Sequence, residues 1–154
     1  MAFSVSACGG PHFNGTVYDD GKLRFHTGPI PSGWRAIDAD GTLVAFHDEQ
    51  AQATVALNGR CGVDGDDVPL ASLTQHLFLQ FTERQQRSQQ ELSLDGRAAL
   101  RTDMVGKLDG VPKQFLVYVL KKDGCVYDFW RIGEPGAGDS SSFEAFVRGF
   151  STEP

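Results

Sequence analysis

Asp-Gly pairs recur along this chain, and they constrain its fold more than any other feature. The last three, Asp95-Gly96, Asp109-Gly110 and Asp123-Gly124, begin at intervals of 14 residues. Asp-Gly favours the tight turns of β-hairpins because both residues tolerate the positive φ that these turns require. The interval leaves about twelve residues for each strand with its turn, which predicts an antiparallel meander of hairpins.

The segments between the turns have the residue patterns of β-strands, in several cases alternating apolar and polar side chains. The predicted strands are Lys22–His26, Trp34–Ile37, Leu43–His47, Thr54–Asn58, Gln89–Leu94, Ala98–Leu108, Gln114–Lys121 and Val126–Ile132. Residues Phe115–Leu120 are apolar at every position, so this strand should lie centrally in the sheet with both of its faces covered.

Two further segments carry the apolar stripe of an amphipathic helix. The first begins at Pro69, with Asp66 and Asp67 placed to cap it, and its stripe consists of Leu70, Leu73, Leu77, Phe78 and Phe81. The second begins with a capping box over residues 141–144, and its stripe consists of Phe143, Phe146, Val147 and Phe150. Each stripe requires a sheet face to cover it. We therefore expect an α+β fold, with one antiparallel sheet and helices packed on its faces in layers.

The composition is that of one ordinary globular domain. The 154 residues are enough to build a hydrophobic core, and 40% of them are apolar. We assign residues 21–152 to the domain and residues 1–20, which are polar and rich in glycine, to a flexible tether. The formal charge of −6 argues against a nucleic-acid partner, because binding phosphates requires a basic surface.

The tether contains a short motif that predicts attachment to a membrane. Residues Val5–Gly10 have the form of a bacterial lipobox, in which an aliphatic residue and two small residues precede the cysteine that receives the lipid. On this interpretation Cys8 is the lipid attachment site, and the domain lies in the cell envelope on the periplasmic side. The alternative is a chance match, since small residues before a cysteine are common, and the protein would then be cytoplasmic.

Two cysteines remain when Cys8 is set aside, and two are the number required for one disulfide. A bond between Cys61 and Cys125 would close a loop of about 65 residues and suits an oxidising compartment. The alternative is a pair of buried free thiols that pack as small apolar side chains.

The chain shows no pattern typical of a catalytic or metal site. It has no Gly-x-Ser-x-Gly, Cys-x-x-Cys or His-x-x-x-His motif, and its four histidines are scattered. Residues 64–67 resemble the start of a calcium loop, but Gln75 stands where such a loop requires a glutamate. We therefore expect no metal, no other cofactor and no catalytic residue.

The order of elements resembles the PsbP-like fold, which the photosystem subunit PsbP shares with DcrB-like bacterial lipoproteins. The features that carry the resemblance are the Trp-containing first hairpin at Pro31–Trp34, the mid-chain helix, the segment Tyr118–Tyr127 and the terminal helix Phe143–Phe150. The resemblance extends from about Lys22 to Phe150. It implies a layered α/β/α sandwich and a binding or accessory role, and it carries no catalytic residue with it.

Three functional hypotheses follow. The first is a non-enzymatic envelope lipoprotein, anchored through Cys8, that binds a protein or lipid partner as an accessory subunit. The second is a small-ligand carrier or an enzyme with a pocket between sheet and helix, with His47, His76 or Cys125 near its mouth. The third is a cytosolic protein-interaction module with free thiols.

Overall fold

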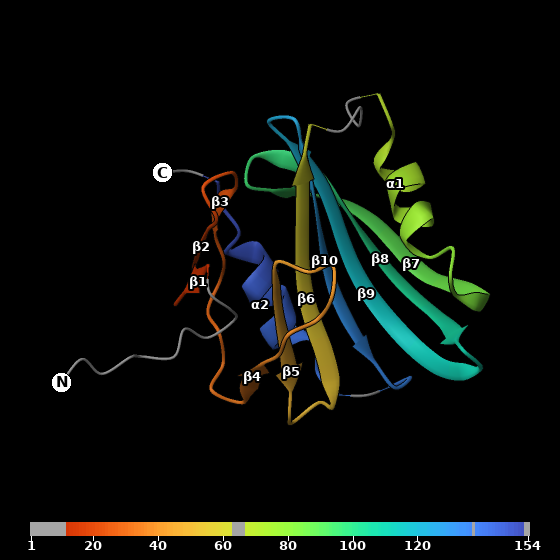
Figure 1. The fold of residues 1–154 in the computed structure, drawn as a ribbon. Helices are drawn as coiled ribbons and strands as arrows, with labels where there is room; N and C mark the ends of the chain where they lie inside the picture. The colour runs from red at the N-terminus through yellow and green to blue at the C-terminus, as the bar shows by residue number, and fades with distance from the viewer. Residues whose placement is uncertain (1–11, 63–66, 137, 153–154) are drawn as a thin grey trace.

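The computed structural model describes residues 12–62, 67–136 and 138–152, which form ten strands and two helices. In chain order these are β1 (Phe13–Asn14), β2 (Val17–Asp19), β3 (Arg24–His26), β4 (Trp34–Ala36), β5 (Val44–Asp48), β6 (Ala53–Cys61), α1 (Leu70–Leu77), β7 (Thr82–Leu94), β8 (Arg97–Leu108), β9 (Val111–Lys122), β10 (Cys125–Gly133) and α2 (Ser141–Arg148). Figure 1 shows one large sheet with a helix on each side and a small sheet beyond α2.

Seven strands form the large sheet, in the order β4-β5-β6-β10-β9-β8-β7, and every neighbouring pair is antiparallel. The consecutive hairpins from β7 to β10 are the predicted meander. In each of their three turns the Asp and the Gly both have positive φ, for example 51° at Asp95 and 73° at Gly96. The Asp-Gly interval therefore predicted both the turns and the strand pairing correctly.

Strand β7 forms one edge of the sheet and is longer than predicted. It starts at Thr82 instead of Gln89, and its side chains are exposed almost throughout. Because neither face of this strand is buried, its Gln- and Arg-rich sequence carries no apolar alternation to reveal it. Two register shifts against β8 and four charged side chains protect this edge from pairing with another chain.

The two helices cover opposite faces of the large sheet, as the layered α+β prediction required. On one face, residues of β8, β9 and β10 pack against α1 and the segment that follows it. The buried residues of this core are Phe78, Phe81, Met104, Phe115, Val117, Val119 and Val126. The opposite face forms a larger, aromatic core with α2 and the small sheet. In that core, Phe146 contacts Trp34 of β4 and Phe129 of β10.

The small sheet β1-β2-β3 belongs to the folded unit and begins upstream of residue 21, the boundary predicted for the domain. Phe13 and Tyr18 are 1% and 4% exposed, and Tyr18 stacks on Phe25. β1 and β2 are too short, at two and three residues, to give a periodic signal in the sequence, whereas β3 lies within the predicted strand Lys22–His26. Residues 12–20 are thus part of the domain and do not act as a tether.

The chain after α2 returns to the small sheet and fastens it. His26 and Ser151 exchange two backbone hydrogen bonds, with N···O distances of 2.7 and 3.1 Å. Gly28 and Gly149 approach so closely that a Cβ on Gly149 would overlap the backbone of Gly28. Glycine is required at this contact because any side chain would separate the two segments.

Both helix starts differ from the predicted caps. Pro69 occupies the N-cap of α1, which lacks a side-chain cap, so the prediction for Asp67 is wrong, while Asp66 lies outside the described residues. Ser140 is the N-cap of α2, and the predicted capping box at 141–144 is also wrong. Its glutamate, Glu144, binds Arg101 of β8 instead, at 2.9 Å. Among the described residues, neither helix is long and apolar enough to cross a membrane.

Candidate functional site

A cleft of about 390 Å³ lies between the C-terminal end of α1, the sheet face beneath it and the turn at 40–42 before β5. We call it the α1 cleft. Its apolar wall is formed by Ala56, Leu77, Phe81, Leu108, Trp130 and Ile132. Its polar side is formed by Asp40, Gly41, Thr42, Asn58, Gln80 and Asp128. An apolar pocket of this size with a few polar groups is typical of small-molecule sites.

Strand alternation places the key side chains in this cleft. Asp128, Trp130 and Ile132 occupy alternate positions of β10 and therefore point to the same face. On β6, Asn58 is directly opposite Asp128, and Ala56 is directly opposite Trp130. The small Ala56 leaves room above the sheet that a larger residue would fill.

Asp128 is a carboxyl group in an unfavourable place for a charge. Its side chain is 8% exposed, and its Oδ1 accepts a hydrogen bond from Trp130 Nε1 at 2.6 Å. Burial raises the pKa of Asp128 to about 6, and this outweighs the lowering effects of the Trp130 hydrogen bond and of Arg60 nearby. A perturbed carboxyl group in a cleft is a recognised mark of a functional site.

The charge of the cleft favours a particular kind of ligand. Of the described residues that line it, two are acidic and none is Lys or Arg. Two aromatic side chains, Phe81 and Trp130, also line the cleft, and aromatic rings attract cations at their faces. The arrangement therefore suits the binding of a donor or cationic group beside an apolar body.

A second polar cluster lies on the opposite face of the sheet and has a structural role. Glu144 Oε1 of α2 is 2.9 Å from a terminal nitrogen of Arg101 and accepts a hydrogen bond from the Tyr118 hydroxyl at 3.2 Å. Burial raises the pKa of Tyr118. The three side chains bind one another, so the cluster fixes α2 on β8 and β9. It leaves few hydrogen-bonding groups available for a ligand.

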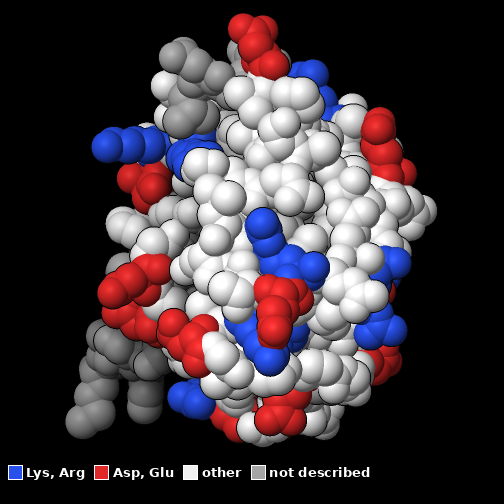
Figure 2. Space-filling model, turned by 90° about the vertical axis from the view of Figure 1, so that its right-hand side faces the viewer, with Lys and Arg blue, Asp and Glu red and all other residues white. Residues whose placement is uncertain are grey.

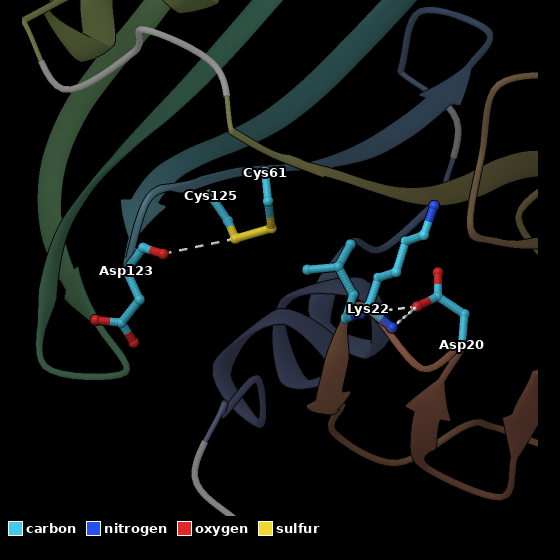
Figure 3. Close-up of a disulfide and its surroundings, with 6 residues drawn as sticks. Asp20, Lys22, Cys61, Asp123 and Cys125 are labelled. Atoms are coloured by element: carbon cyan, nitrogen blue, oxygen red, sulfur yellow. Dashed lines mark hydrogen bonds between the residues drawn. A yellow bond between two sulfur atoms is a disulfide. The ribbon is translucent and has the colours of Figure 1, made fainter.

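The structure joins Cys61 and Cys125 in a disulfide, the pairing expected from the cysteine count. The two residues are directly opposite each other on β6 and β10. Figure 3 shows the bond beside the turn at Asp123, whose carbonyl oxygen is 3.8 Å from Cys125 Sγ. Cys8, the predicted lipid attachment site, lies outside the described residues.

None of the three residues suggested for a pocket mouth lines the α1 cleft. His47 lies on β5, 3.9 Å from Glu49 Oε2, and His76 lines a separate shallow hollow on the outer side of α1. Cys125 is in the disulfide. The structure describes no cluster of three metal-ligating side chains within 12–62, 67–136 and 138–152, and most of the calcium-like segment 64–67 lies outside those ranges.

Sequence reasoning missed Asp128 and Trp130. The available signal was the segment Val126–Ile132, in which a carboxylate stands between aromatic and aliphatic residues of an interior strand of the sheet. A charged side chain in such a strand is costly to bury unless it is paired or hydrogen-bonded, so it marks a candidate functional residue. Its nearness to Phe81 and Asp40 depends on contacts distant in sequence, which no local pattern reveals.

Solved structures with a similar fold are found at low sequence identity. The solution structure of cyanobacterial PsbP (CyanoP) from Synechocystis sp. PCC 6803 has a TM-score of 0.61 and 16% identity, over 97% of this chain and 99% of that one. The crystal structure of LpqN, involved in cell envelope biogenesis of Mycobacterium tuberculosis, has a TM-score of 0.57 and 15% identity, over 90% of each chain.

A third structure, from Bacteroides thetaiotaomicron VPI-5482, has a TM-score of 0.61 and 9% identity. It matches 84% of this chain, which spans only 45% of the length of that protein. No protein-family model matches the chain, and no curated protein matches it by sequence. At these identities the similarity shows the fold alone.

Proposed function

We propose, on the premise that this chain has the PsbP-like fold, that it is a non-enzymatic binding subunit of the cell envelope. The fold itself was predicted from the order of elements, and two structures that match nearly the whole chain confirm it. The fold includes envelope-associated proteins, of which LpqN is one. Membership of the fold does not specify a function, so the proposal depends on features of this chain.

The disulfide is the observation that carries the proposal. Cys61 and Cys125 pair across two strands of the large sheet and close a loop of 64 residues. Disulfides of this kind persist in oxidising compartments and are rare in a reducing cytosol. The bond therefore supports a location outside the cytoplasm and speaks against the hypothesis of a cytosolic module with free thiols.

The thiol state in cells tests this location. Cells of the native host are quenched in acid, free thiols are alkylated, and the protein is isolated and weighed intact before and after reduction. We expect Cys61 and Cys125 to react only after reduction. Two thiols that are alkylated without reduction would remove the support for an extracytoplasmic site.

Lipid attachment at Cys8 is a separate part of the proposal and is supported by the lipobox form of Val5–Cys8. The same intact mass should contain the increment of a diacylglycerol group on Cys8. A Cys8→Ser variant should lose that increment and leave the membrane fraction, with its internal disulfide unchanged. An unmodified Cys8 in wild-type protein would contradict the anchor without affecting the argument from the disulfide.

We place the protein or lipid partner on the surface over α1. Residues 68–82 contain no Lys, Arg, Asp or Glu, and Leu79 is 65% exposed. Figure 2 shows this face, with an uncharged area in its upper half and charged side chains around it. A Leu79→Glu variant should lose a partner that co-elutes with wild-type protein from mild detergent extracts of the envelope. Unchanged co-elution would place the partner site elsewhere.

The α1 cleft supports a second candidate function, that of a small-ligand carrier. Its volume and its mixture of apolar wall and carboxylate suit a small molecule.

A further inference from the structure

The α1 cleft contains a carboxylate whose position is not explained by the stability of the fold. Asp128 lies beneath the segment after α1, with Phe81 and Trp130 among its neighbours in the cleft wall. Its one side-chain hydrogen bond to a described residue comes from Trp130 Nε1. Placing a carboxylate there has a cost in desolvation that an apolar residue would avoid.

The groups that face Asp128 define the charge of the site. On β6, Arg60 lies one alternate position beyond Asn58, and its side chain is exposed. On β9, Lys121 directs its Nζ to the carbonyl oxygen of Val68, at 2.7 Å. The turn before β5 adds a second carboxylate, Asp40. The two basic residues are not among those that line the cleft, so its own lining is acidic.

We infer that the α1 cleft is a binding site for a small organic ammonium ion with an apolar or aromatic body. Asp128 accepts the ammonium group, the ring of Trp130 offers it a cation–π contact, and the apolar wall covers the body of the ligand. This inference extends the small-ligand candidate function and is independent of the location of the protein. Thiol trapping in cells and ligand binding in vitro therefore fail separately.

The probe is the phenethylammonium ion, with 2-phenylethanol as its neutral isostere and 3-phenylpropanoate as its anionic counterpart. Binding to the full chain is followed by calorimetry and by tryptophan fluorescence. Of the two tryptophans, Trp130 lines the cleft and Trp34 lies in the opposite core, so a fluorescence change reports Trp130. A Trp34→Phe variant should keep the change.

We expect saturable binding of the amine at pH 7.5, with affinity at least about tenfold above that of the alcohol and no binding of the carboxylate. Asp128→Asn should lower the affinity for the amine by about tenfold or more and leave the affinity for the alcohol unchanged. The matched control is Asp103→Asn, a carboxylate on the opposite face of the sheet whose Oδ1 accepts a hydrogen bond from Gln114. That variant should bind the amine as wild type does.

The pH dependence of the unmodified protein gives a readout that does not depend on any variant. The amine stays protonated throughout, so its affinity should fall as the pH is lowered through about 6, where Asp128 gains a proton. Equal affinity for amine and alcohol, amine binding unaffected by Asp128→Asn, or no saturable binding at millimolar concentrations would each overturn the inference.

Discussion

Replacing Asp128 with asparagine should stabilise the protein at neutral pH and have little effect in acid. The substitution keeps the size of the side chain and the oxygen that accepts the 2.6 Å hydrogen bond from Trp130 Nε1. It removes the charge and replaces the second carboxylate oxygen with an amide NH2 group. Since the side chain is 8% exposed, the ionised form is held in a poorly hydrated site.

The size of the effect follows from the raised pKa. The pKa of Asp128 is the ordinary value of 3.8 in the unfolded chain and about 6 in the folded protein. Below the lower value the group is neutral in both states. Between the two values the unfolded chain releases a proton that the folded protein keeps, so this group lowers stability as the pH rises. At about 1.4 kcal/mol per pH unit, the cost above pH 7 is about 3 kcal/mol.

Urea unfolding of wild type and Asp128→Asn from pH 4 to pH 8 measures this cost, because other titrating groups cancel in the difference. The stability advantage of the variant should be small at pH 4, grow between pH 4 and pH 6, and level off above pH 7. A difference that does not change with pH, or a variant less stable than wild type at pH 7, would refute the assignment of a buried, charged Asp128.

Three further changes test the packing of the fold, each by urea unfolding at pH 7. Asp95→Asn keeps a residue that tolerates the positive φ of this turn but removes the charge that pairs with Lys122 Nζ at 2.6 Å. It should lower the free energy of unfolding by about 3 kcal/mol, and a loss below about 1 kcal/mol would contradict a buried pair. Replacing both Cys61 and Cys125 with serine opens the 64-residue loop and should cost about 4 kcal/mol, whereas unchanged stability would argue that the bond does not form in solution. Gly149→Ala places a methyl group against the backbone of Gly28 and should lower the free energy of unfolding by about 1–3 kcal/mol. The control Gly33→Ala, whose methyl group meets only Gln50 at 3.9 Å, should change it little. Equal effects of the two substitutions would contradict the close approach of Gly28 and Gly149.

The parts of the fold that local chemistry determines could be predicted from the sequence. The turns at Asp95, Asp109 and Asp123 require positive φ, which Asp-Gly supplies, and the meander follows from their interval. The apolar stripes placed both helices within a few residues of their true bounds. The interior position of β9, beside the middle strand β10, followed from its apolar residues on both faces.

What the sequence did not reveal depends on contacts between distant segments. Strands β1 and β2 of the small sheet were missed because strands of two or three residues have no period, although Phe13 and Tyr18 are buried through tertiary packing. The prediction contained β3 alone, within Lys22–His26. The capping box of α2 failed because Glu144 has a better partner in Arg101, 43 residues away. The α1 cleft was missed for the same reason, because it unites β6, β10, the end of α1 and the turn at 40–42.

The most direct test of the binding site is a carbon-detected NMR titration of the Asp128 carboxyl group, with and without the phenethylammonium ion. We expect a midpoint near pH 6 in the free protein, because burial raises the pKa of this group. The midpoint should be lower when the amine is bound, because the ammonium group stabilises the carboxylate. A midpoint near the ordinary value of 3.8, the same with and without the amine, would contradict both the burial of Asp128 and its role in binding the amine.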